Sequence, residues 1–338
     1  LSGSRFVNNA GAGALSASGG RWLVWSSNAN PFGGATPDNR GGLAYGFKQY
    51  NAIYGVTPVA QPTGNGFLYS LAPTITPGLT GTVSKVYDAT TSAPLAAANF
   101  TPTIGVDGDV VAMSGTGAYD NPNVAGSPTK LVTATGITAA MTSSVADGSK
   151  PVYGYTLTST TASANIGAIT PASLTVTGNT TSNTYTALAQ TNGFTTTGLL
   201  TGNGDSVTGV SGLATRTNVG TTADSLSAAT GAGLGNYTIS YANGSLTITP
   251  AALTLNAVTA TKVYDGTILS TGTVGVVGLV GGDTVTGLSQ TYASKNVLGA
   301  NGSTLAVNAG YVVNDGNGGA NYTVTSNTAR GTITPASL

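Results

Sequence analysis

The tripeptide Ile-Thr-Pro recurs four times along the chain, and its spacing restricts the folds that this sequence can adopt. The copies end at Pro77, Pro171, Pro250 and Pro335, so successive copies are 94, 79 and 85 residues apart. Self-similarity over steps of this size indicates an array of similar units. Units of about 80–90 residues are too long for one coil of a solenoid and have the size of small domains. The sequence therefore predicts a row of small domains.

Four landmarks return in the same order between the closing prolines, which indicates three repeats. The first is a tyrosine, at Tyr87, Tyr185 and Tyr264. The second is an aspartate in a glycine-rich turn, at Asp109, Asp205 and Asp283. The third is an Asn-Val pair, at 123–124, 218–219 and 296–297. The fourth is a tyrosine in a Tyr-Thr pair, at Tyr155, Tyr237 and Tyr322.

The composition favours strands and turns over helices. The 338 residues include 50 glycines, and every acidic residue is an aspartate. Gly, Asp, Asn and Thr are poor helix formers, whereas short alternating runs of Val, Ile and Leu are typical of strands. Disorder is not expected, because 40% of the residues are hydrophobic and the mean hydropathy is +0.15. We therefore expect an all-β chain of tandem small β-sandwich or β-grasp-like repeat domains.

The first 79 residues differ from the rest. They hold both tryptophans and four of the six phenylalanines, and they contain predicted strands at 21–25 and 67–69. Aromatic residues at the end of a β-stack can cover an otherwise open core. We therefore expect 1–79 to be a β-helix-like end or a cap. The predicted domains are 1–79, 80–171, 172–250 and 251–338.

The residue types exclude several classes of function. The chain has no Cys and no His, which excludes thiol chemistry, imidazole catalysis and most zinc sites. Its acids are sparse, so a carboxylate pair for glycoside hydrolysis is not expected. A net charge of zero gives no attraction to nucleic acid. No apolar run is long enough for a transmembrane helix. We expect no enzyme, catalytic residue, metal or cofactor.

The repeated tyrosines have two interpretations. They could face a ligand, or they could fill the core of their own repeat and hydrogen-bond through the hydroxyl, as buried tyrosines usually do. We favour the core. On this interpretation, Tyr264→Ala should cost its repeat about 3–5 kcal/mol.

The charged landmarks are also interpreted structurally. The aspartates in the turns could bind calcium, but no loop collects the six to eight oxygens that calcium needs, and turn aspartates usually accept bonds from their own backbone. Lys85 and Lys262 could form isopeptide bonds with asparagine, but the chain has no Glu to assist. We expect instead exposed ion pairs with Asp88 and Asp265, which contribute little.

Several segments together resemble a known family. The Lys-Val-Tyr-Asp-Gly-Thr segment at 262–267, the Gly-Asp-x-Val turns, the Asn-Tyr-Thr strands and the closing Ile-Thr-Pro-Ala are similar to the YDG and MBG repeats of filamentous-haemagglutinin-like adhesins. The middle repeat has Asn-Thr-Tyr-Thr at 183–186 and resembles the MBG type more closely. Residues 1–79 resemble the connector between a β-helical shaft and such repeats.

This resemblance implies a function and a location. Such adhesins are secreted by Gram-negative bacteria through an outer-membrane two-partner transporter, so an extracellular or cell-surface location is expected. The chain would be a piece of a longer polypeptide, a non-enzymatic structural or adhesive stalk segment for attachment to cells, hosts or biofilm matrix. Its partners would be surface glycans, matrix polysaccharide or neighbouring copies. The alternatives are a carbohydrate-binding module array and a self-assembling filament subunit.

Overall fold

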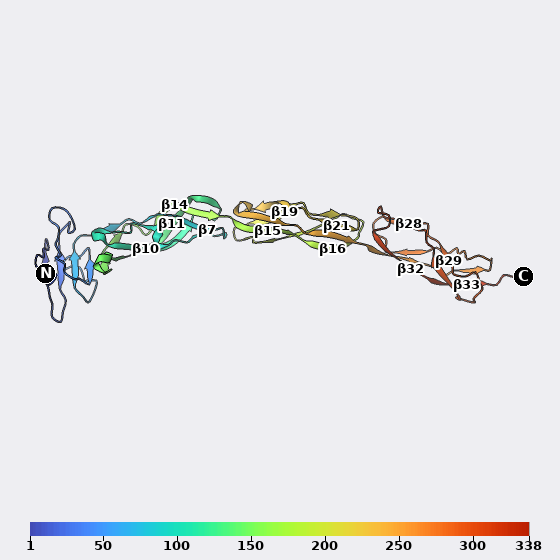
Figure 1. Ribbon diagram of the computed structural model, residues 1–338, viewed down its shortest axis with the longest axis horizontal. Coiled ribbons are helices and arrows are strands. Elements are labelled where there is room, and N and C mark those ends of the chain that lie inside the picture. The colour runs from blue at the N-terminus through green and yellow to red at the C-terminus, as the bar shows by residue number, and fades with distance from the viewer. Residues whose placement is uncertain (338) are drawn as a thin grey trace. The chain divides into compact units, whose positions relative to one another are not determined.

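The computed structural model describes residues 1–337, and their regular secondary structure is almost entirely β-strand (Figure 1). The helical elements of this described part are four single 3-10 turns, which fits the low helix propensity of the sequence. The predicted all-β class is therefore confirmed. The chain divides into two compact units, and the first holds Leu1–Ala172, Leu200–Asn203 and Gly235–Tyr237. The second compact unit contains the rest of the second repeat and the third repeat.

Residues 1–172 supply fourteen strands and three 3-10 turns. The strands are β1 (Ser2–Gly3), β2 (Leu23–Ser26), β3 (Phe47–Gln49), β4 (Gly66–Tyr69), β5 (Thr74–Ile75), β6 (Gly78–Leu79), β7 (Val83–Val86), β8 (Ser92–Ala93), β9 (Phe100–Thr101), β10 (Val110–Tyr119), β11 (Ala125–Thr142), β12 (Pro151–Tyr153), β13 (Thr156–Leu157) and β14 (Ala162–Thr170). The 3-10 turns are η1 (Ala97–Asn99), η2 (Val106–Gly108) and η3 (Val145–Asp147).

The N-terminal segment forms a parallel sheet in the order β1-β2-β4-β3. These strands are short, run parallel and are joined by long loops, and β4 lies between β2 and β3. Alternate side chains of these strands build an aromatic core that includes Val24, Phe67 and Tyr69. Both strands predicted for this segment are present, as β2 and β4.

The N-terminal sheet continues into the first repeat. Strand β3 pairs in parallel with β12, and the sheet then runs through β11, β10 and β8, while β14 pairs with β11 and β7. The N-terminal segment and the first repeat therefore share one ten-stranded sheet.

The later repeats supply the remaining elements. The second repeat contains β15 (Ala172–Gly178), β16 (Thr180–Thr184), β17 (Gln190–Thr191), β18 (Phe194–Thr197), β19 (Ser206–Ser211), β20 (Thr215–Arg216), β21 (Gly220–Ala223), β22 (Ser227–Ala232), η4 (Leu234–Asn236), β23 (Tyr237–Ala242) and β24 (Ser245–Thr249). The third repeat contains β25 (Ala251–Asn256), β26 (Thr261–Val263), β27 (Gly275–Val277), β28 (Thr284–Thr286), β29 (Gln290–Tyr292), β30 (Ser303–Val307), β31 (Val312–Asn314), β32 (Tyr322–Asn327) and β33 (Ala329–Thr334).

All three repeats use the same parallel pairings. The strand that precedes the landmark tyrosine pairs with the last strand of its repeat, as β7 with β14, β16 with β24 and β26 with β33. The first strand of a repeat lies beside the strand at the fourth landmark, as β15 beside β23 and β25 beside β32. These pairings join the two ends of each repeat, so the periodic landmarks occupy equivalent places in the fold.

The first Ile-Thr-Pro copy does not occupy the same place as the other three. The later copies close a repeat, because β14, β24 and β33 end one residue before Pro171, Pro250 and Pro335. The copy ending at Pro77 instead interrupts the opening strand of the first repeat. Strand β5 pairs with β13, and β6 pairs with β9 just as β25 pairs with β27. Proline fits both places, because neither place requires its nitrogen to donate a hydrogen bond to a neighbouring strand. The opening strand thus lies before residue 80.

Candidate functional site

The landmark tyrosines lie where consecutive repeats meet. Tyr87 follows β7 and packs edge-to-face on Tyr237 of the next repeat, with 5.4 Å between ring centroids. Tyr185 follows β16 and packs in the same way on Tyr322, at 5.5 Å. Edge-to-face pairs add about 0.5–1.5 kcal/mol beyond the area that they bury. Each joint between repeats is therefore centred on a tyrosine pair.

Within the second compact unit, an aspartate connects the two tyrosines of the joint. Asp283 Oδ2 accepts hydrogen bonds from the hydroxyl of Tyr185 at 3.1 Å and from that of Tyr322 at 2.7 Å. Burial, together with the hydrogen bond to Asp283, raises the pKa of Tyr322 to about 12. The phenol therefore stays neutral and donates to the carboxylate over the whole physiological range.

The asparagines of the Asn-Val pairs and the asparagines directly before Tyr237 and Tyr322 also meet at the joints. Asn321 Oδ1 accepts from the backbone N–H of Val219 at 2.9 Å, and its Nδ2 donates to Asn218 Oδ1 at 3.1 Å. At the preceding joint, Asn236 accepts from the N–H of Val124 at 2.9 Å. Because these bonds satisfy otherwise orphaned backbone groups, they fix the register of one repeat on the next.

The expectation that each landmark tyrosine fills the core of its own repeat is wrong for Tyr264. Its side chain is 40% exposed, whereas Tyr87 and Tyr185 are 2% and 3% exposed. The reason is that the tyrosine of the following repeat covers Tyr87 and Tyr185. No described residue covers Tyr264 in this way. The landmark tyrosine is thus a joint residue.

The remaining landmarks divide between joints and strand ends. Tyr237 and Tyr322 are buried at their joints, as is the turn aspartate Asp109, and Asp205 is also buried. Pro171, Pro250 and Pro335 are exposed at the ends of closing strands. Turn aspartates were expected to accept bonds from their own backbone, and in addition the carboxylates of Asp109 and Asp283 accept bonds from tyrosine hydroxyls.

The N-terminal segment contributes a joint of the same kind. Tyr50, directly after β3, packs edge-to-face on Tyr155 at 5.1 Å. Both hydroxyls donate to Asp109 Oδ2 at 3.0 Å. Burial, followed by the charge of Asp109, raises the pKa of Tyr50, which keeps it neutral. Tyr50 was not among the predicted landmarks, although the Lys-x-Tyr spacing at 48–50 matches that at 85–87 and 262–264.

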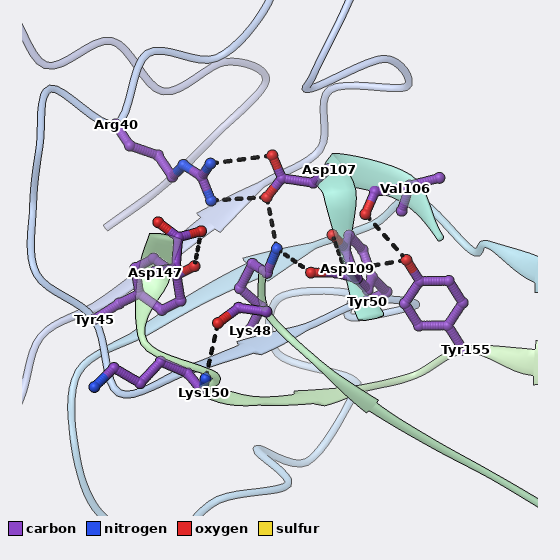
Figure 2. A network of polar contacts seen from close by, with 11 residues as sticks. Arg40, Tyr45, Lys48, Tyr50, Val106, Asp107, Asp109, Asp147, Lys150 and Tyr155 are labelled. Carbon is purple, nitrogen blue, oxygen red and sulfur yellow. Dashed lines mark hydrogen bonds and ion pairs between the residues drawn. The ribbon is translucent and has the colours of Figure 1, made fainter. Parts of the chain in front are cut away.

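This first joint also contains a buried ion network (Figure 2). Lys48 Nζ lies between two carboxylates: it contacts Asp109 Oδ1 directly and donates to Asp107 Oδ2 at 2.6 Å. Arg40 donates two parallel hydrogen bonds to Asp107, at 2.8 and 3.0 Å. The side chains of Lys48 and Asp109 are both 0% exposed. Burial raises the pKa of the Asp109 carboxyl more than the neighbouring Lys48 lowers it.

Arg40 is held above the aromatic core of the N-terminal segment. Its guanidinium carbon lies 5.8 Å from the ring centre of Phe32, 5.6 Å from Tyr45 and 5.9 Å from Phe67. Cation–π contacts of this geometry orient a guanidinium whose fork matches a carboxylate. The aromatic residues predicted to plug the segment therefore also position the arginine that binds Asp107.

The exposed lysine pairs are as expected. Lys85 contacts Asp88 at 2.6 Å, and Lys262 contacts Asp265 at 2.8 Å, with the carboxylates 49% and 54% exposed. The hydrogen bond from Lys262 lowers the pKa of Asp265 to about 2. Such surface pairs contribute little to stability.

Two further surveys cover the described residues alone. Residues 1–337 contain no group of three or more acidic side chains arranged to hold a metal ion. None of their helical turns has the length and apolar character that a membrane crossing requires.

Comparison with known proteins identifies the repeats. The YDG domain model matches residues 72–162 and 249–329, which together make up just over half of the chain. Its first match begins before residue 80, in agreement with the opening strand β5. The middle repeat lies between the two matched ranges. No curated protein matches the chain. The repeated strand plan and the two matches place this chain in the YDG domain family.

Proposed function

We propose that the chain is a non-enzymatic stalk segment of an extracellular bacterial adhesin of the filamentous-haemagglutinin type, secreted by the two-partner route. The observation that carries the proposal is the recurrent joint, in which a tyrosine pair and an asparagine connect one repeat to the next. A stalk transmits load from domain to domain, so it needs joints that resist bending. A freely jointed row of binding modules has no such need.

The joint also supports the proposal through its chemistry. The bonds of Asn321 reach Val219, 102 residues earlier, and the equivalent bond of Asn236 spans 112 residues. Each joint therefore connects distant strands, and pulling on the chain loads several hydrogen bonds together. The asparagine side chains are uncharged, so salt screens their hydrogen bonds little. These properties suit a structure that works outside the cell.

The experiment that tests this proposal is immunolabelling of the cells that produce the protein. Antibodies raised against residues 1–338 should label intact, unpermeabilised cells, and deletion of this segment should reduce attachment to host cells or to biofilm matrix. Labelling that appears only after permeabilisation would contradict the extracellular location. Unchanged attachment by the deletion strain, with the protein still displayed, would contradict the stalk role.

A carbohydrate-binding role is the second candidate, and one surface hollow favours it. Trp25, Ile53 and Tyr54 line this hollow in the N-terminal segment. Tyr54 is 65% exposed, and its ring meets Trp25 edge-on at 5.6 Å. Exposed aromatic faces of this kind bind sugar rings. Saturable binding on a glycan array that is lost in Tyr54→Ala would favour this role over the stalk.

A self-assembling filament is the third candidate. In the third repeat, the surface equivalent to the earlier joints is exposed, with Val263 59% and Tyr264 40% accessible. Another copy could cover it. Fibres of the purified chain in electron micrographs, absent in Tyr264→Ser, would favour this candidate.

A further inference from the structure

The ion pair between Lys48 and Asp109 is buried more deeply than its structural role requires. Both side chains are 0% exposed, and Lys48 Nζ is in direct contact with Asp109 Oδ1. Among the described residues, no hydrogen-bond donor other than Lys48 reaches Asp109 Oδ1. Withdrawing two charges from water costs several kcal/mol per ion, and a buried pair often fails to recover this cost.

The joint between the second and third repeats shows that the lysine is not needed to build a joint. There, Asp283 accepts the same two tyrosine hydroxyls, from Tyr185 and Tyr322. Asp283 has no ion-pair partner within the described chain. The residue two positions before Tyr185 is the exposed Asn183, where the first joint has Lys48. The first joint has therefore acquired a nucleophile and a second carboxylate in addition to the shared tyrosine–aspartate core.

We propose that Lys48 and Asp109 condense to an intramolecular isopeptide bond, with Asp107 as the group that transfers the proton. The three side chains lie where this reaction needs them: the amine contacts the carboxyl that it attacks, and Asp107 Oδ2 lies 2.6 Å from Lys48 Nζ. This reaction goes beyond the stalk function and does not depend on it.

The reaction balances without any added reagent. A proton passes from the Lys48 ammonium to the Asp109 carboxylate, which leaves a neutral amine in contact with a neutral acid. The lone pair on Nζ attacks Cγ of Asp109 to form the C–N bond, and Asp107 takes the proton that the attacking nitrogen then loses. Asp107 delivers this proton to Oδ1, the bond from Cγ to Oδ1 breaks, and Oδ1 leaves as water with the two protons that came from the ammonium. One ammonium and one carboxylate thus become one amide and one water, and Asp107 returns to its pairing with Arg40.

The surroundings of Asp109 assist each step. Burial raises the pKa of its carboxyl, which favours the acid form that can lose water. The hydroxyls of Tyr50 and Tyr155 donate to Oδ2, where negative charge develops in the tetrahedral intermediate. Holding amine and carboxyl in contact gives an effective molarity that can reach about 10⁵ M or more. The product is a neutral amide, so the unfavourable buried charges disappear.

The product would be a covalent connection between the N-terminal segment and the first repeat. Residues 49–108, which lie between the two bonded side chains, would be shielded from a force applied along the backbone. The covalent bond would thus link the two parts of the chain that share the ten-stranded sheet.

The test is the intact mass of the purified chain under denaturing conditions. We expect it to be one water lighter than the mass of the sequence, and a digest should contain a branched peptide in which Lys48 is joined to Asp109. A wild-type chain of full mass, with a circular dichroism spectrum of folded β-structure, would overturn the proposal.

Matched variants separate the isopeptide bond from other water losses. Asp107 precedes Gly108, a pair prone to succinimide formation, which also loses one water. Lys48→Met should restore the full mass, whereas a succinimide would persist and overturn the proposal. Lys130→Met removes another buried lysine, which pairs with Asp120, and should leave the chain one water lighter.

Asp107→Asn tests the proton transfer. It is also the alternative test of the proposal if the Lys48→Met variant does not fold. It keeps both reacting groups, so the water loss should be slowed by about 10²-fold or more, the usual contribution of a general base. Unchanged kinetics of cross-linking would overturn the role of Asp107.

Discussion

Replacing Tyr185 with alanine should destabilise the second compact unit far more than the same replacement at Tyr264. The two residues occupy the same landmark, but Tyr185 is 3% exposed and belongs to the hydrophobic core, whereas Tyr264 is 40% exposed. Truncation of a buried aromatic residue costs about 3–5 kcal/mol. At an exposed site away from special contacts, the cost is usually within about 0.5 kcal/mol. The loss of stability that the sequence predicted for Tyr264→Ala is therefore expected for Tyr185→Ala instead.

Tyr185→Phe divides this cost into two parts. It keeps the edge-to-face contact with Tyr322 and removes the hydroxyl that donates to Asp283. A hydrogen bond to a charged group contributes about 1.5–3 kcal/mol. Asp283 retains its shorter bond from Tyr322, so we expect a value near the lower end of that range. The order of destabilisation should be Tyr185→Ala, then Tyr185→Phe, then Tyr264→Ala.

The assay uses the uneven distribution of tryptophan. Trp22 and Trp25 are the two tryptophans of the chain, and both lie in the first compact unit. Their fluorescence during urea unfolding should be unchanged by all three variants. Limited proteolysis with mass mapping reports the second unit, where Tyr185→Ala should be cleaved fastest. Equal sensitivity of Tyr185→Ala and Tyr264→Ala would refute the assignment of the landmark tyrosine to a joint.

Three further predictions concern the alkaline pH range, calcium and the first joint. Burial raises the pKa of Tyr322 from its ordinary value near 10 to about 12. The stabilising effect of the neutral phenol should therefore be complete below pH 10 and lost as the pH rises to 12. The unfolding curve of Tyr322→Phe at alkaline pH should lack this loss of stability. EDTA should leave the melting temperature unchanged, and a fall of more than about 10 °C would contradict the expectation that the turn aspartates bind no structural calcium. Gly154→Ala should destabilise the first joint in thermal melts, because φ is +83° and an added Cβ would lie 2.0 Å from the Tyr50 carbonyl oxygen.

The sequence predicted the features that depend on local pattern. Turn residues, alternating strands and the order of landmarks are encoded within a few residues of each other, so the all-β class and the repeat could be inferred. The partner of each landmark could not. Asn321 and Asn218 belong to landmarks that recur once in each repeat, but such a pattern is the same whether a residue contacts its own repeat or the next one. The hydrogen bond between Asn321 and Asn218 crosses a joint, and only the fold reveals this.

The contacts of Lys48 in the ion network also could not be predicted from the sequence. Lys48, Lys85 and Lys262 each lie two residues before a joint tyrosine. Lys85 and Lys262 find a carboxylate three residues later, at Asp88 and Asp265, and stay at the surface. The residue three positions after Lys48 is an asparagine, so no local carboxylate is available. Its ammonium turns instead to the carboxylates of the adjoining repeat. The absence of one local acid thus accounts for a lysine in a buried joint, and no pattern within residues 1–79 reveals which carboxylates it meets there.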